Sequence, residues 1–277
     1  MKSQHSIVLL LVSSLSIGAA FTTSSFITRP YAVAPAAPSL KAGGFEYQED
    51  DQYDSIENPF KNDSSYDEEG ALKVDAARLL GPRLKGSSVY LVGMMGSGKS
   101  AVGNVLAKRM GTYSFLDTDT IVENATGMKI PEIFESEGEE GFRDVESQIL
   151  DSVHAYVRCV VSTGGGIVCR AKNWSKLQSG IVIFLDVEPD VIMSRIEGTD
   201  RPLLQTENPL ETLTNLLEER RGKYEQADVT VKITASMDEN AVVNEIAKEM
   251  HQFIDENPPA WKQAKEKAQA EGLDWVQ

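Results

Sequence analysis

The stretch that most constrains the fold is residues 93–100, Gly-Met-Met-Gly-Ser-Gly-Lys-Ser. It follows the apolar run 88–92, which predicts a buried strand, and precedes 101–110, where apolar residues recur at helical spacing before Gly111. A strand, a glycine-rich loop ending in Gly-Lys-Ser and a helix together indicate a phosphate-binding P-loop. The glycines let successive backbone N–H groups point at one phosphate, and the helix N-terminus adds a positive dipole. The chain is therefore expected to bind a nucleoside triphosphate.

The rest of the central region alternates between strand-like and helix-like stretches from about residue 74 to residue 251. Such alternation is typical of a parallel sheet covered by helices. With the first strand at 88–92, five strands are expected, which predicts an α/β protein: a three-layer α/β/α P-loop kinase of the nucleoside-monophosphate-kinase type. The other expected strands are 113–116, 158–162, 181–185 and 229–233, and the expected later helices are 131–134, 139–153, 189–196, 209–224 and 239–253.

Carboxylates at strand ends are the candidate Mg²⁺ partners of the loop. Lys99 is placed to reach the β- and γ-phosphates, and the hydroxyl of Ser100 to bind the metal. Asp186 ends one apolar run, whereas Asp117 ends the strand after the loop helix and has Asp119 two residues on. Two aspartates so spaced can divide the work between the metal and the acceptor hydroxyl. We therefore favour Asp117 and Asp119 over Asp186, with helix capping as the alternative role of Asp119.

Further polar features follow along the chain. Arg143 and Glu146 are i, i+3 neighbours on an expected helix, so the acid can hold the guanidinium for recognition of a small carboxylate; a surface ion pair is the alternative. The turn at 163–166, Thr-Gly-Gly-Gly, gives bare N–H groups at a strand's carboxyl end, where ligands of open α/β sheets bind. Arg201 lies in a short crossing where a lid would close over the phosphates and exclude water.

Composition excludes some partners. The chain has 277 residues and a formal charge of −15, which argues against a nucleic-acid groove. Much of the acidity lies in residues 46–73, where carboxylates surround the single Lys61 of 46–69 without apolar periodicity; this indicates a disordered linker, or alternatively an acidic docking segment. Cys159 and Cys169 are too few for a disulfide framework or a zinc site.

The two ends of the chain have their own patterns. Residues 1–45 join a short apolar signal-like stretch to a hydroxylated, acid-free segment, which resembles a bipartite signal and transit presequence for a plastid, the chloroplast stroma; secretion is the alternative. The mature form is then expected to have no membrane association. The tail 257–277 carries Trp261 and Trp275, and docking on its own domain and binding of a partner both remain open.

Six motifs in order resemble those of the shikimate kinase family over residues 86–253. They are the P-loop, Asp117-x-Asp119, Gly138-Glu139-x-x-Phe142-Arg143-x-x-Glu146, the 163–166 turn, Arg201-Pro202-Leu203-Leu204 and Arg220-x-x-x-Tyr224. The resemblance implies a kinase domain at 74–256 that uses ATP and Mg²⁺ to phosphorylate the 3-hydroxyl of shikimate, in aromatic amino acid (chorismate) biosynthesis. It leaves the oligomeric state unknown, with a monomer favoured.

The resemblance also implies roles for single residues. The catalytic residues would be Lys99, Asp119 and Arg201, with Ser100 and Asp117 as metal ligands, the latter through water. ATP would contact Gly96, Ser97, Gly98, Lys99, Ser100, Ala101, Arg195 and Arg201, and shikimate would contact Asp119, Arg143, Gly164, Gly165, Gly166 and Arg220.

Two positions depart from the family pattern. Ala101 stands where many members have Thr, so a hydroxyl contact to phosphate is lost. Arg220 and Arg221 are adjacent, and the spacing to Tyr224 selects Arg220 while leaving Arg221 as a substitute. The alternatives in function are another small-metabolite kinase, such as a gluconate kinase, and a catalytically silent kinase-like binding or scaffold protein.

Overall fold

The apolar runs form one parallel sheet with the strand order β2-β3-β1-β4-β5. The strands are β1 (Val89–Val92), β2 (Ser114–Asp117), β3 (Cys159–Ser162), β4 (Ile181–Val187) and β5 (Val229–Ile233). Every residue of β1 and β3 is buried, because a parallel sheet is covered on both faces. Since all strands run the same way, their carboxyl ends, including Asp117 of β2 and its register partner Ser162 of β3, meet along one edge.

The structure is a computed structural model that describes residues 56–61, 65–67, 70–196, 198 and 202–258. Its helices in chain order are η2 (Pro59–Lys61), α3 (Ala76–Arg83), α4 (Lys99–Met110), α5 (Thr118–Thr126), α6 (Ile130–Val153), η4 (Ile167–Cys169), α7 (Ala171–Leu177), α8 (Pro189–Ile196), η5 (Pro202–Leu204), α9 (Pro209–Tyr224) and α10 (Glu239–Glu256). Within the described ranges, no helix is both long and apolar enough to cross a membrane.

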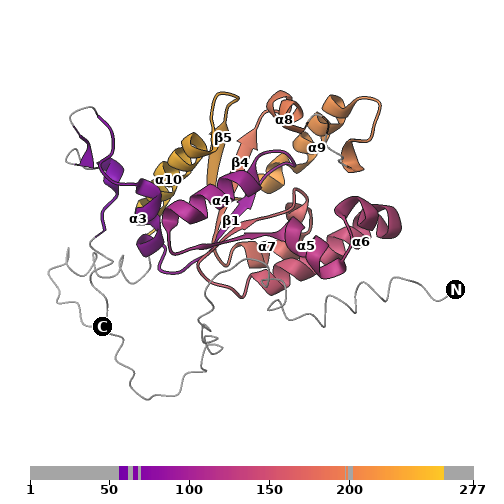
Figure 1. The fold of residues 1–277 in the computed structure, drawn as a ribbon, viewed down its shortest axis with the longest axis horizontal. Helices are drawn as coiled ribbons and strands as arrows, with labels where there is room; N and C mark the ends of the chain where they lie inside the picture. The colour runs from indigo at the N-terminus through magenta and orange to yellow at the C-terminus, as the bar shows by residue number, and fades with distance from the viewer. Residues whose placement is uncertain (1–55, 62–64, 68–69, 197, 199–201, 259–277) are drawn as a thin grey trace, which may run out of the picture.

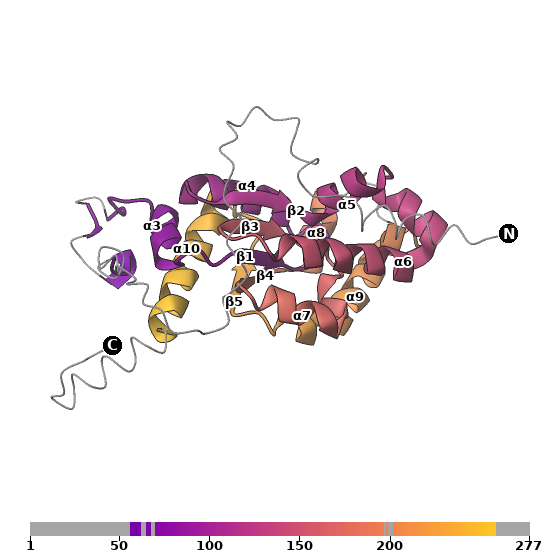
Figure 2. The ribbon, with the colours of Figure 1, turned by 90° about the horizontal axis from the view of Figure 1, so that it is seen from below.

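The helices divide between the two faces of the sheet. The loop helix α4 packs with α10 and α3 on one face, and α7 and α9 lie on the other (Figure 2). For α4, α7 and α9 this division follows from right-handed crossovers, because the chain moves outward from β1 to β2 through α4 and then reverses direction along the sheet. The three-layer α/β/α prediction is confirmed. Helices α6 and α9 lie at the opposite end of the molecule from α3 and α10 (Figure 1).

The helix bounds agree with the sequence pattern where the start signals are strong. Helices α8 and α9 begin at Pro189 and Pro209, because proline suits the first turn. The two helices expected at 131–134 and 139–153 form one element, α6, that is broken at Gly138, whose φ is 70°. Helices α3 and α7 were not expected; α3 carries Pro82 inside it, and α7 has only 7 residues.

Residues 56–61 pack against α10, although they belong to the predicted acidic linker. Asn58 donates a hydrogen bond to Asp255 at 2.9 Å, and Lys61 pairs with the same carboxylate at 2.7 Å. The ring of Phe60 meets the ring of His251 edge-on, with centroids 5.9 Å apart. His251 is fully buried. Residues 1–55 and the tail from 259 onward, with their predicted roles, lie outside the described residues.

Candidate active site

The P-loop has the backbone that only glycine accepts. Gly93, Gly96 and Gly98 all have positive φ, at 145°, 75° and 93°. A side chain on Gly96 would also come within 2.9 Å of the Cγ2 atom of Ile192 on α8. The loop therefore lies directly under α8 and leads into α4, whose first residue is Lys99. Its N–H groups and the amino end of α4 together form an anion site.

The side chain of Lys99 folds back over this loop. It is buried, at 7% exposed, and Nζ donates hydrogen bonds to the carbonyls of Gly93 at 2.9 Å and Met94 at 2.7 Å. The hydroxyl of Ser97 lies 3.3 Å from the same nitrogen. These contacts hold the ammonium within the loop, where it faces any phosphate that the loop binds.

Ser100 meets Asp117 at the carboxyl edge of the sheet. The Ser100 hydroxyl donates a hydrogen bond to Oδ2 of Asp117 at 2.6 Å, and the Ser162 hydroxyl lies 3.3 Å from it. The other oxygen of Asp117 accepts a bond from the N–H of Thr120, which caps α5. A hydroxyl and a carboxylate are oxygen ligands of the kind that Mg²⁺ prefers, so this pair fits the metal. No group of three or more His, Cys, Asp or Glu side chains is placed to hold a metal among the residues described.

Asp186, the other candidate acid at a strand end, interacts with a different residue. Asp186 lies in β4, and its carboxylate pairs with Arg221 at 3.3 Å. The preference for Asp117 over Asp186 as the neighbour of Ser100 thus agrees with the geometry.

The triple-glycine turn is the wall of a polar site next to the P-loop. A side chain on Gly164 would overlap the carboxylate of Glu146 and lie 2.9 Å from Oδ1 of Asp119. One on Gly166 would overlap the guanidinium of Arg143, and one on Gly165 would lie 3.0 Å from the backbone N of Met95 in the P-loop. Glycine is required at these three positions because carboxylates, a guanidinium and the backbone of the P-loop come so close to the turn that they leave no room for a side chain. Asp119 is not the cap of α5, since Asp117 has that role.

Arg143 and Glu146 form a buried ion pair, not a surface one. The guanidinium is 5% exposed and the carboxyl residue 1%, and their atoms lie 2.9 Å apart. Glu139, at i−4, holds the other nitrogen of Arg143 at 2.9 Å. Burial tends to lower the pKa of Arg143, but the two carboxylates outweigh it and the pKa is raised. Burial holds the pKa of Glu146 above its ordinary value, against the opposing effect of Arg143.

The structure distinguishes the two adjacent arginines of α9. Arg220 is 4% exposed, and its Nη2 lies 3.8 Å from Glu139. In the part of the chain that the structure describes, no hydrogen-bond acceptor reaches Nε or Nη1 of Arg220. A buried guanidinium with unused donors suits an anionic ligand, because the charge needs compensation. Arg221 instead pairs with Asp186.

The remaining predicted residues lie around the loop. Arg195 on α8 is exposed and donates to the carbonyl of Ser97 at 3.5 Å, which places it over the P-loop. Ala101 is exposed in the first turn of α4. Arg201 lies outside the described residues. Sequence reasoning gave no role to Glu139 or Ser162. The i, i+4 spacing to Arg143 is a signal for Glu139, whereas Ser162 becomes a neighbour only through strand register.

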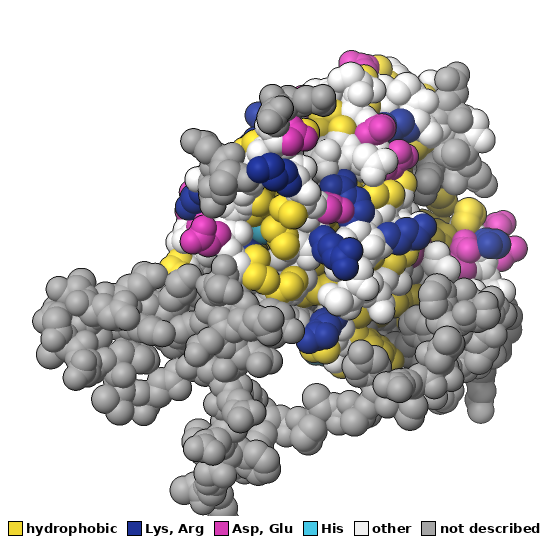
Figure 3. Space-filling view, turned by 60° about the vertical axis from the view of Figure 1, so that its left-hand side comes forward, with side chains coloured by type: hydrophobic (Ala, Val, Ile, Leu, Met, Phe, Trp, Pro, Cys, Tyr) yellow, Lys and Arg dark blue, Asp and Glu magenta, His cyan; other side chains and the backbone are white. Residues whose placement is uncertain are grey.

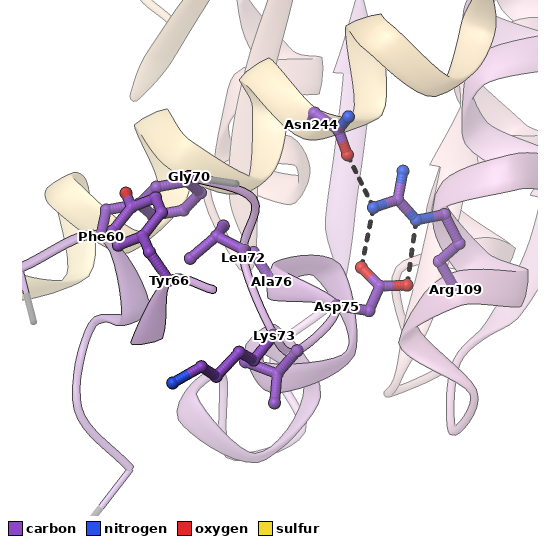
Figure 4. A pocket seen from close by; sticks show the side chains of 10 residues that line it. Phe60, Tyr66, Gly70, Leu72, Lys73, Asp75, Ala76, Arg109 and Asn244 are labelled. Atoms are coloured by element: carbon purple, nitrogen blue, oxygen red, sulfur yellow. Dashed lines mark hydrogen bonds and ion pairs between the residues drawn. The ribbon is translucent and has the colours of Figure 1, made fainter. Parts of the chain in front are cut away.

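A separate hollow of about 580 Å³ lies away from this site. It is lined by residues from η2 to α3, with Arg109 of α4 and Asn244 of α10. Arg109 holds both oxygens of Asp75 and the side chain of Asn244 (Figure 4). Arg109 lies near the opposite end of α4 from the P-loop, about 15 Å along the helix from Lys99. Because of this distance, the hollow is not the phosphate site. On the side of the molecule that faces the viewer in Figure 3, charged and hydrophobic side chains are interspersed.

Fold and site together define a P-loop kinase of the nucleoside-monophosphate-kinase type. Comparison with known proteins narrows this class. The family model "Shikimate kinase" matches residues 95–251. A shikimate kinase of Synechococcus elongatus is 52% identical over 164 residues, which cover 59% of this chain and 86% of that protein. The chain belongs to the shikimate kinase family, and the family expected from the six motifs is confirmed.

Comparison with solved structures supports the same family. A shikimate kinase from Acinetobacter baumannii in complex with shikimate has a TM-score of 0.57 and 37% identity, over 63% of this chain and 96% of that one. The shikimate kinase of Aquifex aeolicus has a TM-score of 0.53 and 33% identity, over 62% and 99%. The chain is thus an enzyme, a kinase of the shikimate pathway.

Proposed function

We propose that this chain transfers the γ-phosphoryl group of ATP to the 3-hydroxyl of shikimate, giving ADP and shikimate 3-phosphate. One observation carries the proposal beyond family membership: Asp119 and Arg143 lie against the triple-glycine turn, which itself lies on the P-loop, and the buried Arg220 lies beside Glu139, the partner of Arg143. An acid for a hydroxyl and guanidinium groups for a carboxylate thus lie next to a phosphate cradle.

On the nucleotide side, the backbone of residues 96–101 would hold the β- and γ-phosphates, with Lys99 neutralising their charge. Ser100 and Asp117 would hold Mg²⁺, which would offset negative charge on the transferring group. Arg195, already over the loop, would lie beside the nucleotide. Arg201 would close over the phosphates as the lid arginine. Ala101 would contribute only its backbone N–H.

On the acceptor side, Arg143 and Arg220 would clamp the shikimate carboxylate. Glu139 and Glu146 hold Arg143 in place, so its fork is oriented before substrate arrives. The bare backbone of Gly164, Gly165 and Gly166 would let the ring hydroxyls approach closely. Asp119 would orient the 3-hydroxyl and accept its proton as the oxygen attacks the γ-phosphorus and ADP leaves. Catalysis is then mainly in-line positioning and charge neutralisation.

A coupled ADP-release assay tests the proposal. We expect release that depends on shikimate and not on gluconate, which separates this activity from that of another small-metabolite kinase. A soluble, ATP-binding preparation without shikimate-dependent release would refute it, and would favour the silent scaffold alternative. Lys99, Asp119, Arg143 and Arg220 are all present, which argues against loss of catalysis.

We also propose a plastid location for the mature enzyme, from the signal-like and transit-like composition of residues 1–45. Fusion of these residues to a fluorescent protein should direct it to the plastid, whereas fluorescence in the culture medium would favour secretion. We also propose that the enzyme is a monomer. Light scattering coupled to size-exclusion chromatography measures its molar mass in solution.

A further inference from the structure

Tyr224 is the last residue of α9, one helical turn beyond Arg220, and its side chain is fully buried. Its ring stacks on Phe184 of β4, with centroids 5.0 Å apart and an interplanar angle of 11°. Packing of this kind allows the ring little freedom, so the position of its hydroxyl is determined by the sheet.

The hydroxyl lies where three parts of the site meet. It donates a hydrogen bond to the carbonyl of Gly165 at 2.5 Å, and it lies 3.7 Å from the sulfur of Met94 in the P-loop. Burial raises the pKa of Tyr224, so the group remains a donor across the working range. Helix α9, the glycine turn and the phosphate loop are thereby joined at one atom.

The turn held in this way touches the groups proposed to act on the acceptor. Gly164 lies against Asp119 and Glu146, and Gly166 lies against the guanidinium of Arg143. A shift of the turn would move this wall relative to the P-loop. In-line transfer depends on such distances, because small misplacements of the reacting atoms lower the rate strongly.

We propose that Tyr224 is a positioning residue: its hydroxyl holds the glycine turn against the P-loop and so aligns the acceptor hydroxyl with the transferred phosphoryl group. This role rests on the proposed shikimate kinase function. Tyr224 contacts neither reactant in this scheme. It acts through Gly165, and its hydroxyl also interacts with Arg220 one turn earlier on α9.

Tyr224→Phe tests the role, because it keeps the ring and its stacking on Phe184 and removes only the hydroxyl. The Gly165 carbonyl then loses its donor, and we expect kcat/KM for shikimate to fall about tenfold while KM for ATP changes less than about twofold. We also expect faster amide exchange at Ile167 and Cys169, whose N–H groups bond within the turn to Gly164 and Gly166.

Tyr113→Phe is the matched control. Tyr113 is also buried, and its hydroxyl donates to the carbonyl of Ser87 at 3.0 Å, but it precedes β2 at the edge of the sheet opposite the site. Both variants should lose similar stability, since each removes one buried tyrosine-to-carbonyl bond. Only Tyr224→Phe should change the shikimate dependence and the exchange of the turn.

Equal kinetic changes in the two variants, or unchanged kinetics in Tyr224→Phe, would overturn the positioning role. If the wild-type chain released no ADP with shikimate, the proposed function would fall instead. The exchange measurement would then still decide whether Tyr224 holds the turn, with unchanged exchange at Ile167 and Cys169 overturning that claim.

Discussion

Replacing Arg143 with alanine perturbs the buried ion pair and the proposed carboxylate clamp together. Its partner Glu146 is 1% exposed and would stay in the interior without its cation. Breaking a buried pair in this way costs about 3–5 kcal/mol, because the remaining charge is neither solvated nor paired. At about 2–4 °C per kcal/mol for a domain of this size, we expect the melting temperature to fall by about 6–20 °C.

The loss should depend on pH, because Glu146 can take up a proton. Burial already raises its pKa above the ordinary 4.5, and removal of Arg143 removes the main group that opposes the rise. Above pH 4.5, Glu146 has lost its proton in the unfolded chain but keeps it in the folded variant. The pKa of Glu146 is about 7 in the wild type, so both chains lose stability between pH 4.5 and pH 7. Above pH 7 only Arg143→Ala continues to lose stability, by about 1.4 kcal/mol per unit, or about 2 kcal/mol between pH 7 and pH 8.5.

Urea denaturation of the wild type and of Arg143→Ala, followed by circular dichroism at pH 6 and pH 8.5, measures this difference. The control is Arg143→Ala combined with Glu146→Gln, in which position 146 cannot titrate and the slope should disappear. The same loss at both pH values, or a slope that persists in the double variant, would refute the reasoning.

The same variant tests the clamp. Loss of a charge-assisted bond to the substrate carboxylate should raise KM for shikimate about 10- to 150-fold and leave KM for ATP nearly unchanged. A shikimate amide, which lacks the carboxylate charge, should be discriminated against by the wild type and less strongly by Arg143→Ala, in which only Arg220 of the clamp remains. An unchanged shikimate KM would mean that the ion pair has a structural role only.

Three further predictions follow from the same contacts. Asp119→Asn should lower kcat by about 10²–10⁴-fold while ATP binding, measured by calorimetry, is retained; equal loss of both would contradict an acceptor-side role. Arg220→Met should raise KM for shikimate strongly, whereas Arg221→Met, which only frees Asp186, should leave it within about twofold, as steady-state kinetics would show. Burial lowers the pKa of His251 from 6.5 to about 4. Between pH 6.5 and pH 4, His251 is therefore protonated in the unfolded chain and neutral in the folded chain. Stability should therefore fall by about 3 kcal/mol from pH 6.5 to pH 4, and denaturation of His251→Asn should lack this part of the slope.

Several elements of the fold could be predicted because their signals are local. The glycines of the P-loop need positive φ, and the helices at Pro189 and Pro209 begin where proline suits the first turn. Helix α3 was missed because Pro82 stands inside it, where proline normally ends a helix. Packing against α4 and α10 outweighs that preference.

The candidate site was predicted less completely than the fold. Its residue types and order indicated the family, but the choice between Arg220 and Arg221 stayed open. Adjacent residues of a helix point in different directions, and the sequence does not show which direction faces the site. The burial of His251 could not be predicted from the sequence, because the groups that cover it come from distant parts of the chain, including Phe60 and Arg83.

By itself, the sequence determined that this chain has a glycine-rich P-loop between a strand and a helix, that its strands alternate with helices, and that its motifs are those of one kinase family. These features depend on backbone sterics and on spacings of a few residues, which act wherever the chain lies. Only the tertiary structure decided that Asp117 meets Ser100, that Arg220 and not Arg221 faces Glu139, and that Tyr224 reaches Gly165. Those contacts depend on the strand order β2-β3-β1-β4-β5, which joins segments far apart in the chain.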